Sequence, residues 1–392
     1  MTIFHLSDLH IGIRLYEKDM YDDQKHVLDQ IVAVAEKQHP DAVVIAGDIY
    51  DKALPSTEAV TLFDGFVTNL KEASSGTAVM IISGNHDSAP RINAYRNILK
   101  AQGVHVIGMP PEKQGEHIEK LTLYDSFGPV NFYLLPFVKP SMIRGITGTK
   151  EDGSGLGYTE AISRLVGLET IDSGERNIIV SHQFYVPSGS DPAEAERSDS
   201  EIIQVGNVDA VDAGILKQFD YAALGHIHRT MRVGADNIRY SGSPLQYSVS
   251  EAAQNKSFIQ VRLGEKIGGR TEMELELVPL TPLRRIRVVK GRLDEVIASG
   301  SDDYVSAVIT DEAGLDAVDT RDRLKAAFPN LLEIRREFPT GAGYSYLPDD
   351  GAENGEPIPG PLELCRLFMP DMSDDQEKIL KDVINTVKEA TP

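Results

Sequence analysis

The stretch that decides the fold is Ser83-Gly84-Asn85-His86-Asp87, which follows directly on the apolar run Ala78-Val79-Met80-Ile81-Ile82. This order predicts a buried strand that ends in a tight glycine turn, with an amide, an imidazole and a carboxylate at the strand's C-terminal end. Open α/β sheets carry their chemistry at that edge. The amide oxygen of Asn suits a divalent metal, and an oriented His can act as a general acid. An ordinary Asn/Asp-rich turn is the alternative that five residues cannot exclude.

The composition is that of a folded, acidic protein. The chain has 392 residues, 41% of them hydrophobic, and a formal net charge of −21. Its length favours two or three domains.

The single cysteine, Cys365, cannot form an intrachain disulfide, and the first residues lack the features of a secretion signal. No apolar run approaches the roughly 20 residues that span a bilayer. We therefore expect a cytoplasmic protein that does not contact membranes.

The acidic charge bears on possible partners. Neutralising nucleic-acid phosphates requires clustered Lys and Arg, so a net charge of −21 argues against a simple nucleic-acid clamp. A bound metal pair can nevertheless reverse the sign locally. The charge thus weakens a DNA-binding interpretation without excluding it. It suggests that a partner contributes to holding the DNA.

Four other predicted strands also end in potential metal ligands. The strand ends are Ser7-Asp8-Leu9-His10, Gly47-Asp48-Ile49-Tyr50-Asp51, Ser181-His182-Gln183-Phe184 and Gly225-His226-Ile227-His228. In Asp-x-His and His-x-His the two side chains share one face of an extended backbone. A predicted helix at 22–37 joins the first two strands as a right-handed crossover, and another follows at 56–70. Each strand end has a structural alternative, as a turn former or a hydrogen-bonded core residue.

Together, however, the five strand ends favour one shared explanation. Carboxylate, amide and imidazole ligands without thiolate suit Mn²⁺, Fe or Zn²⁺ better than Ca²⁺, and a mononuclear zinc site rarely needs so many ligands. Two ions can generate a hydroxide and stabilise an in-line displacement at phosphorus. The sequence therefore predicts a two-metal site.

In this order, the motifs Asp-x-His, Gly-Asp-x-x-Asp, Gly-Asn-His-Asp, Ser-His-Gln-Phe and Gly-His-x-His resemble the calcineurin-like metallophosphoesterase superfamily. With Ser7-Asp8-Leu9-His10-Ile11-Gly12 at the start, the chain is similar to the Mre-type nuclease family within it. The resemblance implies an α/β fold, a β-sandwich flanked by helices in four αββα layers. It also implies a Mn²⁺-dependent DNA nuclease, cutting duplex ends 3′ to 5′ and single strands or hairpins endonucleolytically. An SbcC-like coiled-coil ATPase would control this activity in DNA end processing, repair and recombination.

The resemblance also implies residue roles. One metal ion would be held by Asp8, His10, Asp48 and His228, and the other by Asp48, Asn85, His182 and His226. Asp48 would bridge the two. His86 matches the family's non-ligand histidine, which is expected to protonate the leaving 3′ oxygen or stabilise the transition state. Some relatives have a second histidine where this chain has Asp51, and we hypothesise that the Asp51 carboxylate hydrogen-bonds His86 and keeps it cationic.

Four regions are expected along the chain. They are a nuclease domain at 1–278, a small α+β domain at 279–338, a linker rich in Gly, Pro and acid at 339–361, and a helical pair at 362–392. The resemblance implies that the helical pair docks the ATPase. It also implies a homodimer through helices at 56–70 and 91–101, for which ordinary core is the alternative. Residues 144–158 are rich in glycine and predict a loop.

The clearest positive feature lies in the small domain, which resembles the family's DNA-capping domain. The predicted DNA contacts are Arg284, Arg285, Arg287, Lys290 and Arg292. Alternating charges on a strand are more often a solvated face, which is the competing interpretation.

Two other functions are considered. A small-molecule phosphodiesterase or nucleotidase could use the same catalytic domain; the extra domain and tail argue against it, and the acidic charge argues mildly for it. An inactive scaffold on a phosphoesterase fold is disfavoured, because every expected ligand position is filled.

Overall fold

The structure is a computed structural model that describes residues 1–192, 198–201, 209–311 and 316–337, together with 345–346, 376–378 and 380–381. Met1–Ser345 and Tyr346–Pro392 form two separate compact units. The predicted linker at 339–361 and helical pair at 362–392 fall almost entirely outside the described residues, and the predicted boundary at 278/279 stays a prediction.

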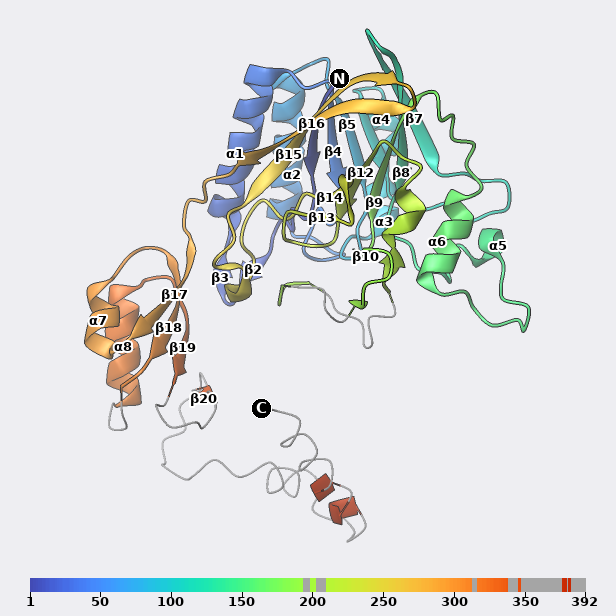
Figure 1. Cartoon of the computed structure of the whole chain (residues 1–392). Coiled ribbons are helices and arrows are strands. Elements are labelled where there is room, and N and C mark those ends of the chain that lie inside the picture. Colours follow the sequence, from blue (N-terminus) through green and yellow to red (C-terminus); the bar gives the residue numbers. More distant parts are fainter. Residues whose placement is uncertain are drawn as a thin grey trace. The chain divides into compact units, whose positions relative to one another are not determined.

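The first of two large sheets holds the N-terminal motifs (Figure 1). Its strand order is β16-β15-β1-β4-β5-β6. The strands are β1 (Thr2–Leu6), β4 (Ala42–Ala46), β5 (Ala78–Ile82), β6 (Val104–Ile107), β15 (Ser257–Ile267) and β16 (Arg270–Pro279). The first four are parallel, and β15 runs antiparallel to both β1 and β16. Every residue of β4 is buried, as expected for a parallel strand covered on both faces.

The second sheet has the order β13-β14-β12-β9-β8-β7. Its strands are β7 (Glu119–Asp125), β8 (Gly128–Leu135), β9 (Arg176–His182), β12 (Tyr221–Gly225), β13 (Met231–Val233) and β14 (Ala235–Tyr240). The four middle strands are parallel, and a hairpin closes each edge. The predicted strand ends at His182 and His226 therefore belong to this sheet, whereas the other three belong to the first.

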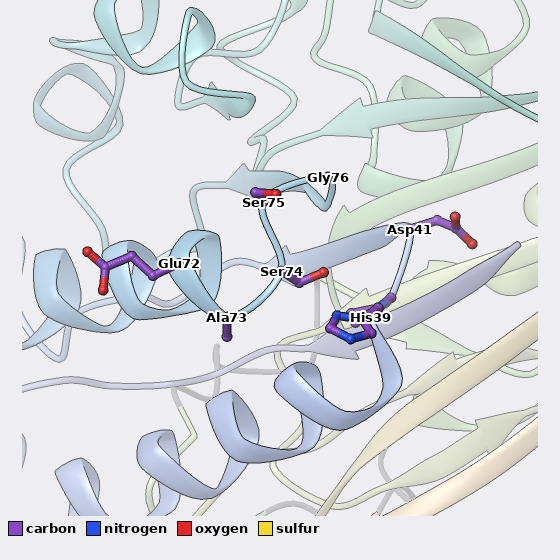
Figure 2. A pocket seen from close by; sticks show the side chains of 8 residues that line it. His39, Asp41, Glu72, Ala73, Ser74, Ser75 and Gly76 are labelled. Carbon is purple, nitrogen blue, oxygen red and sulfur yellow. The ribbon is translucent and has the colours of Figure 1, made fainter.

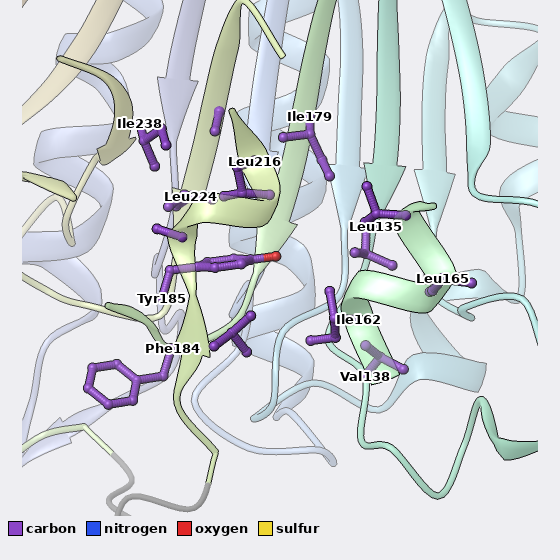
Figure 3. Close-up of a cluster of buried hydrophobic side chains, with 14 of the residues drawn as sticks. Leu135, Val138, Ile162, Leu165, Ile179, Phe184, Tyr185, Leu216, Leu224 and Ile238 are labelled. Carbon is purple, nitrogen blue, oxygen red and sulfur yellow. The ribbon is translucent and has the colours of Figure 1, made fainter. Parts of the chain in front are cut away.

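Three hydrophobic clusters define the layers. The sheets pack on each other through residues such as Val44 and Ile178. Helices α1 (Tyr21–Gln38) and α2 (Thr57–Ala73) cover the outer face of the first sheet through the cluster that contains Ile45. Helix α6 (Tyr158–Val166) covers the outer face of the second, where Ile162 and Leu165 pack near Leu135 (Figure 3). The predicted four-layer αββα fold is confirmed.

Two local predictions differ from the structure. The single helix predicted at 91–101 is two short helices, α3 (Ala89–Asn93) and α4 (Arg96–Lys100). Between them Tyr95 adopts φ −107° and ψ 13°, and the nearby Asn93 Oδ1 accepts a hydrogen bond from the Gly108 N–H at 3.2 Å. Within the loop predicted at 144–158, residues Arg144–Thr147 form the short helix α5, which ends at Gly148 with a positive φ of 77°.

The small region after the sandwich alternates strands and helices. It contains β17 (Ile286–Gly291), α7 (Leu293–Ala298), β18 (Tyr304–Ile309), α8 (Ala317–Ala327) and β19 (Leu331–Arg336). The three strands pair in parallel, so the region is built from βαβ crossovers. It has its own hydrophobic cluster, which includes Val305, Leu324 and Phe328.

The remaining elements are short. They are β2 (Arg14–Leu15), β3 (Lys18–Asp19), β10 (Tyr185–Val186), β11 (Val211–Asp212), η3 (Ala213–Leu216), η4 (Val249–Glu251) and β20 (Ser345–Tyr346). Within the part of the chain that the structure describes, no helix is long and apolar enough to cross a membrane.

Candidate metal centre

The five predicted strand ends meet at one place, between the C-terminal ends of the two sheets. Backbone hydrogen bonds join the first two loops directly, because Asp8 N–H donates to the Gly47 carbonyl and His10 N–H donates to the Asp48 carbonyl, both at 3.0 Å. Among the residues that the structure describes, three overlapping groups of side chains lie close enough to hold an ion, with ligand atoms within 4.8 Å of one another. These groups are Asp8/His10/His228, His10/Asp48/His86 and Asp8/Asp48/His182.

One half of the centre is formed by two facing imidazoles. His10 Nε2 lies 3.1 Å from His228 Nε2 and 3.7 Å from Asp48 Oδ2. All three side chains are buried. Two ring nitrogens at this separation cannot both carry a hydrogen that points at the other, so at least one of them is unprotonated, as a metal-binding imidazole nitrogen must be.

The other half is arranged around the amide of Asn85. Its Oδ1 lies 3.0 Å from His182 Nε2 and 2.8 Å from His226 Nδ1. His182 Nε2 is in turn 3.2 Å from Asp48 Oδ2. Asp48 therefore faces both halves through the same oxygen, which is the position that a bridging carboxylate occupies.

The donor set fits a pair of divalent cations. Asp8 and Asp48 are 0% and 2% exposed, and buried carboxylates are costly unless a cation compensates them. The Nδ1 atom of His10 is buried and has no hydrogen-bond partner among the described residues. Imidazole, carboxylate and amide ligands are the set that Mn²⁺, Fe and Zn²⁺ accept. One ion would be held by the side that contains His10 and the other by the side that contains Asn85.

The electrostatics of the centre also favour the binding of cations. Burial raises the pKa of Asp8. Burial also acts to raise the pKa of Asp48, but the nearby imidazoles, His182 first, outweigh it and hold that pKa well below its ordinary value. For His182 burial favours the neutral ring, yet Asp48 prevails and raises the pKa to about 9. Protons thus balance the carboxylates here, and a metal ion would release them.

Several of the predicted ligands adopt an uncommon backbone conformation. Asp8, His10, Asp48 and His226 have positive φ angles of 52°, 43°, 49° and 108°. Such conformations in residues other than glycine each cost about 1–3 kcal/mol and gather at functional sites. The His226 N–H donates to both carboxylate oxygens of Asp8, at 3.0 and 3.1 Å, which helps to hold that turn.

Two glycines of the motifs are needed for close approach. A Cβ atom at Gly84 would overlap the carboxylate and backbone nitrogen of Asp48. A Cβ atom at Gly225 would overlap the Ala46 carbonyl and the His182 ring. The loops that carry the ligands can approach one another this closely only because these positions have no side chain.

His86 is fixed in two ways. Its backbone N–H donates to Asp48 Oδ1 at 2.8 Å, and its ring Nδ1 lies 2.9 Å from the carbonyl oxygen of Asp51. A carbonyl only accepts, so Nδ1 carries the hydrogen. The expected bond from His86 to the Asp51 carboxylate is thus replaced by one to the backbone of the same residue. That carboxylate instead lies 4.0 Å from His10 Nδ1.

Asp87 joins two of the loops. Its carboxylate accepts hydrogen bonds from the N–H groups of Gly84, Tyr50 and Ile49 at 2.9, 3.0 and 3.1 Å. Burial, followed by the charge of Asp48, raises the pKa of Asp87 to about 6, although the three amides oppose the rise. Asp87 therefore supports the centre by fixing the loop that carries Asp48 to the loop that carries Asn85.

Sequence reasoning missed the residues that hold the ligand loops. Gln24 Nε2 donates to the carbonyls of Leu9 and His10 at 3.2 and 2.8 Å, and its Oε1 accepts from Gly12 N–H at 3.0 Å. A polar residue on the buried face of the helix predicted at 22–37 was the available signal. Ser200, Glu251 and Lys256, which surround His228, had no comparable signal because they lie outside the motifs.

The predicted DNA contacts are mostly placed beside carboxylates. Arg284 pairs with the fully buried Asp23 at 2.6 Å. The other three pairs are Arg287 with Asp303 at 3.3 Å, Lys290 with Glu337 at 2.5 Å and Arg292 with Asp311 at 3.9 Å. Arg285 is exposed, and the described residues provide its side chain with no ion pair. Of the five residues, Arg285 is thus the one whose charge is least compensated.

A separate cavity lies at the opposite edge of the first sheet. It measures about 340 Å³ and is lined by the residues that follow α1 and α2, including His39, Asp41 and Gly76 (Figure 2). Because parallel strands begin at this edge, the cavity is remote from the ligands at their C-terminal ends. It contains none of the predicted site residues.

The fold and the centre together define a metal-dependent phosphoesterase. The chain belongs to the calcineurin-like phosphoesterase family, whose sequence profile matches residues 1–230.

Several solved structures are similar to this chain at low identity. The TT1561 protein of Thermus thermophilus has 15% identity and a TM-score of 0.38, with 70% of this chain and 97% of that chain covered. A putative 5′-nucleotidase from Staphylococcus aureus has 12% identity and a TM-score of 0.41, covering 83% and 57%. A dimetal phosphatase from Danio rerio has 15% identity and a TM-score of 0.40, covering 72% and 99%.

Proposed function

We propose that this phosphoesterase is a DNA nuclease with two divalent metal ions, Mn²⁺ as the preferred species. It would cut duplex ends 3′ to 5′ and single strands or hairpins endonucleolytically. The observation that carries the proposal is His86, which is fixed through Asp48 and Asp51 at the edge of the metal centre. The order of the motifs, which resembles that of SbcD, the nuclease subunit of the bacterial SbcCD complex, supports the choice of DNA.

The residues divide the chemistry between them. When bound, the two ions would supply a hydroxide and stabilise negative charge at phosphorus. His86, with its Nδ1 hydrogen held by the Asp51 carbonyl, would present the other ring nitrogen to the substrate. Protonated there, it would donate to the leaving 3′ oxygen as a general acid. The hydrogen bond to the carbonyl keeps the ring in this orientation.

Three partners belong to the proposal. Arg285 and the region 286–336 would contact DNA, and the segment 362–392 would dock an SbcC-like coiled-coil ATPase. A homodimer would form through the helices at 57–73 and 89–100, where Val60, Tyr95 and Ile98 are exposed apolar residues. Exposed apolar residues of this kind support the proposed interface. We place this activity in the cytoplasm, in DNA end processing, repair and recombination.

A cleavage assay on hairpin DNA with Mn²⁺ tests the proposal. The wild type should cut the hairpin, and His86→Ala should not. If the wild type leaves DNA intact but hydrolyses a cyclic nucleotide, the small-molecule phosphodiesterase is the correct alternative. Deleting residues 362–392 should abolish co-purification with the ATPase, and retained binding would contradict the proposed docking segment.

A further inference from the structure

The ligand His228 is held by a buried group of residues that the motifs do not contain. Its ring Nδ1 lies 2.8 Å from Ser200 Oγ and 3.4 Å from Glu251 Oε1. Ser200 Oγ donates to the same Glu251 oxygen at 2.6 Å. Glu251 is 0% exposed, and Lys256 Nζ lies 2.6 Å from its Oε2. A buried carboxylate, a hydroxyl and an ammonium thus form a continuous chain behind one imidazole.

The hydrogen-bond roles along this chain determine the state of the His228 ring. The one proton of the Ser200 hydroxyl is used toward Glu251, a carboxylate that only accepts. The hydroxyl must therefore accept from His228, which places the ring hydrogen on Nδ1. In the neutral ring Nε2 then has the free lone pair, and it is the atom that faces His10 Nε2 at 3.1 Å.

The backbone of His228 is fixed by the same group. Its N–H donates to Glu201 Oε1 at 2.9 Å, and its carbonyl accepts from Lys256 Nζ at 2.8 Å. Lys256 therefore binds both Glu251 and the peptide of His228. Neither the ring nor the backbone of this ligand can rotate without breaking bonds in a buried setting, where lost hydrogen bonds are costly.

We propose that Glu251 is a positioning residue for the metal centre, and that with Ser200 and Lys256 it fixes the tautomer and orientation of His228. Carboxylates behind a metal-bound histidine commonly change metal affinity by about 10–100-fold when they are removed. The inference rests on the metal centre and not on the DNA substrate. A failure of DNA cleavage would leave it untouched.

The test measures Mn²⁺ binding to the full chain by electron paramagnetic resonance of the free ion. Glu251→Gln should lower the affinity for one of the two ions at least tenfold and leave the affinity for the other within about twofold of the wild-type value. Glu251→Gln also leaves Lys256 buried without its carboxylate, so the double variant Glu251→Gln/Lys256→Met is measured beside it. The double variant should show the same selective weakening.

Asp220→Asn is the matched control. It removes a carboxylate that pairs with Lys266 at 2.9 Å and lies before β12, at the opposite end of the strand from His226. This variant should bind both ions as the wild type does. The proposal is overturned if the double variant retains wild-type affinity for both ions. It is also overturned if Asp220→Asn lowers the affinity for the same ion as much as Glu251→Gln does.

The tautomer supplies a second measurement that a merely structural role would not change. In the metal-free wild type, the ¹⁵N shifts of His228 should show a hydrogen on Nδ1. In Glu251→Gln they should move toward a mixture of tautomers. Unchanged shifts would contradict the positioning role.

Discussion

The backbone N–H of His86 donates to the Asp48 carboxylate at 2.8 Å, so the proposed acid and the proposed bridging ligand are joined by a bond that does not involve the imidazole. This relationship separates the two roles of the loop. The side chain of His86 can be removed while its backbone still holds Asp48 in place.

We therefore expect His86→Ala to retain both metal ions and to lose about 10²–10⁴-fold in cleavage rate, the usual contribution of a general acid. Asn85→Ala should instead weaken Mn²⁺ binding, because Asn85 Oδ1 is within 3.0 Å of both His182 and His226. Mn²⁺ titrations beside hairpin cleavage distinguish the two variants. Loss of metal in His86→Ala would show that His86 is itself a ligand.

Gly84→Ala should abolish metal binding, because its Cβ atom would overlap Asp48. Gly65→Ala is the matched control, since Gly65 lies in α2 with no atom within 4 Å of an added Cβ. The control should raise the free energy of unfolding by up to about 1 kcal/mol, as expected for Gly to Ala in a helix. Mn²⁺ titration and urea unfolding check both variants. Normal metal binding in Gly84→Ala would mean that the loop has room to move.

Arg284 and Arg285 are neighbours with different expected effects. Arg284→Ala removes the charged partner of buried Asp23 and should cost about 1–3 kcal/mol of stability. Arg285→Ala should change stability by no more than about 0.5 kcal/mol. If Arg285 contacts a phosphate, its removal should reduce the salt dependence of DNA binding by about one unit of slope. An unchanged slope would count against a role for Arg285 in DNA binding.

His5 should make stability depend on pH. Burial lowers its pKa from 6.5 to about 3, although the bond to the Leu224 carbonyl opposes the change. Between these values only the unfolded chain is protonated at His5. The free energy of unfolding should therefore fall as the pH drops below about 6.5, by up to about 1.4 kcal/mol per pH unit.

His5→Gln provides the comparison, because Gln can bond Tyr221 and Leu224 without titrating. Urea unfolding between pH values of about 7 and 5, which span the unfolded-state pKa of histidine, should show a shallower dependence in the variant. The same pH dependence of the free energy of unfolding in both proteins would contradict the assignment of this dependence to His5.

Much of the fold follows from local sequence. The buried strand predicted at 78–82 has the observed bounds, because a short apolar run between turn residues has few other solutions. The helix predicted at 91–101 is broken at Tyr95, beside a contact between Asn93 and Gly108, which are distant in sequence. The spacing of apolar residues along the helix contains no information about such a contact.

The sequence by itself determined which candidate residues gather at one site, because polar residues that directly follow buried strands lie at the sheet edge. Only the tertiary structure decided how these residues are arranged and which groups each of them contacts. It placed Asp48 between the two halves of the centre, bonded His86 to the backbone rather than the carboxylate of Asp51, and surrounded His228 with Ser200, Glu251 and Lys256. These contacts join residues from different sheets and loops, and their distances depend on how the two sheets pack.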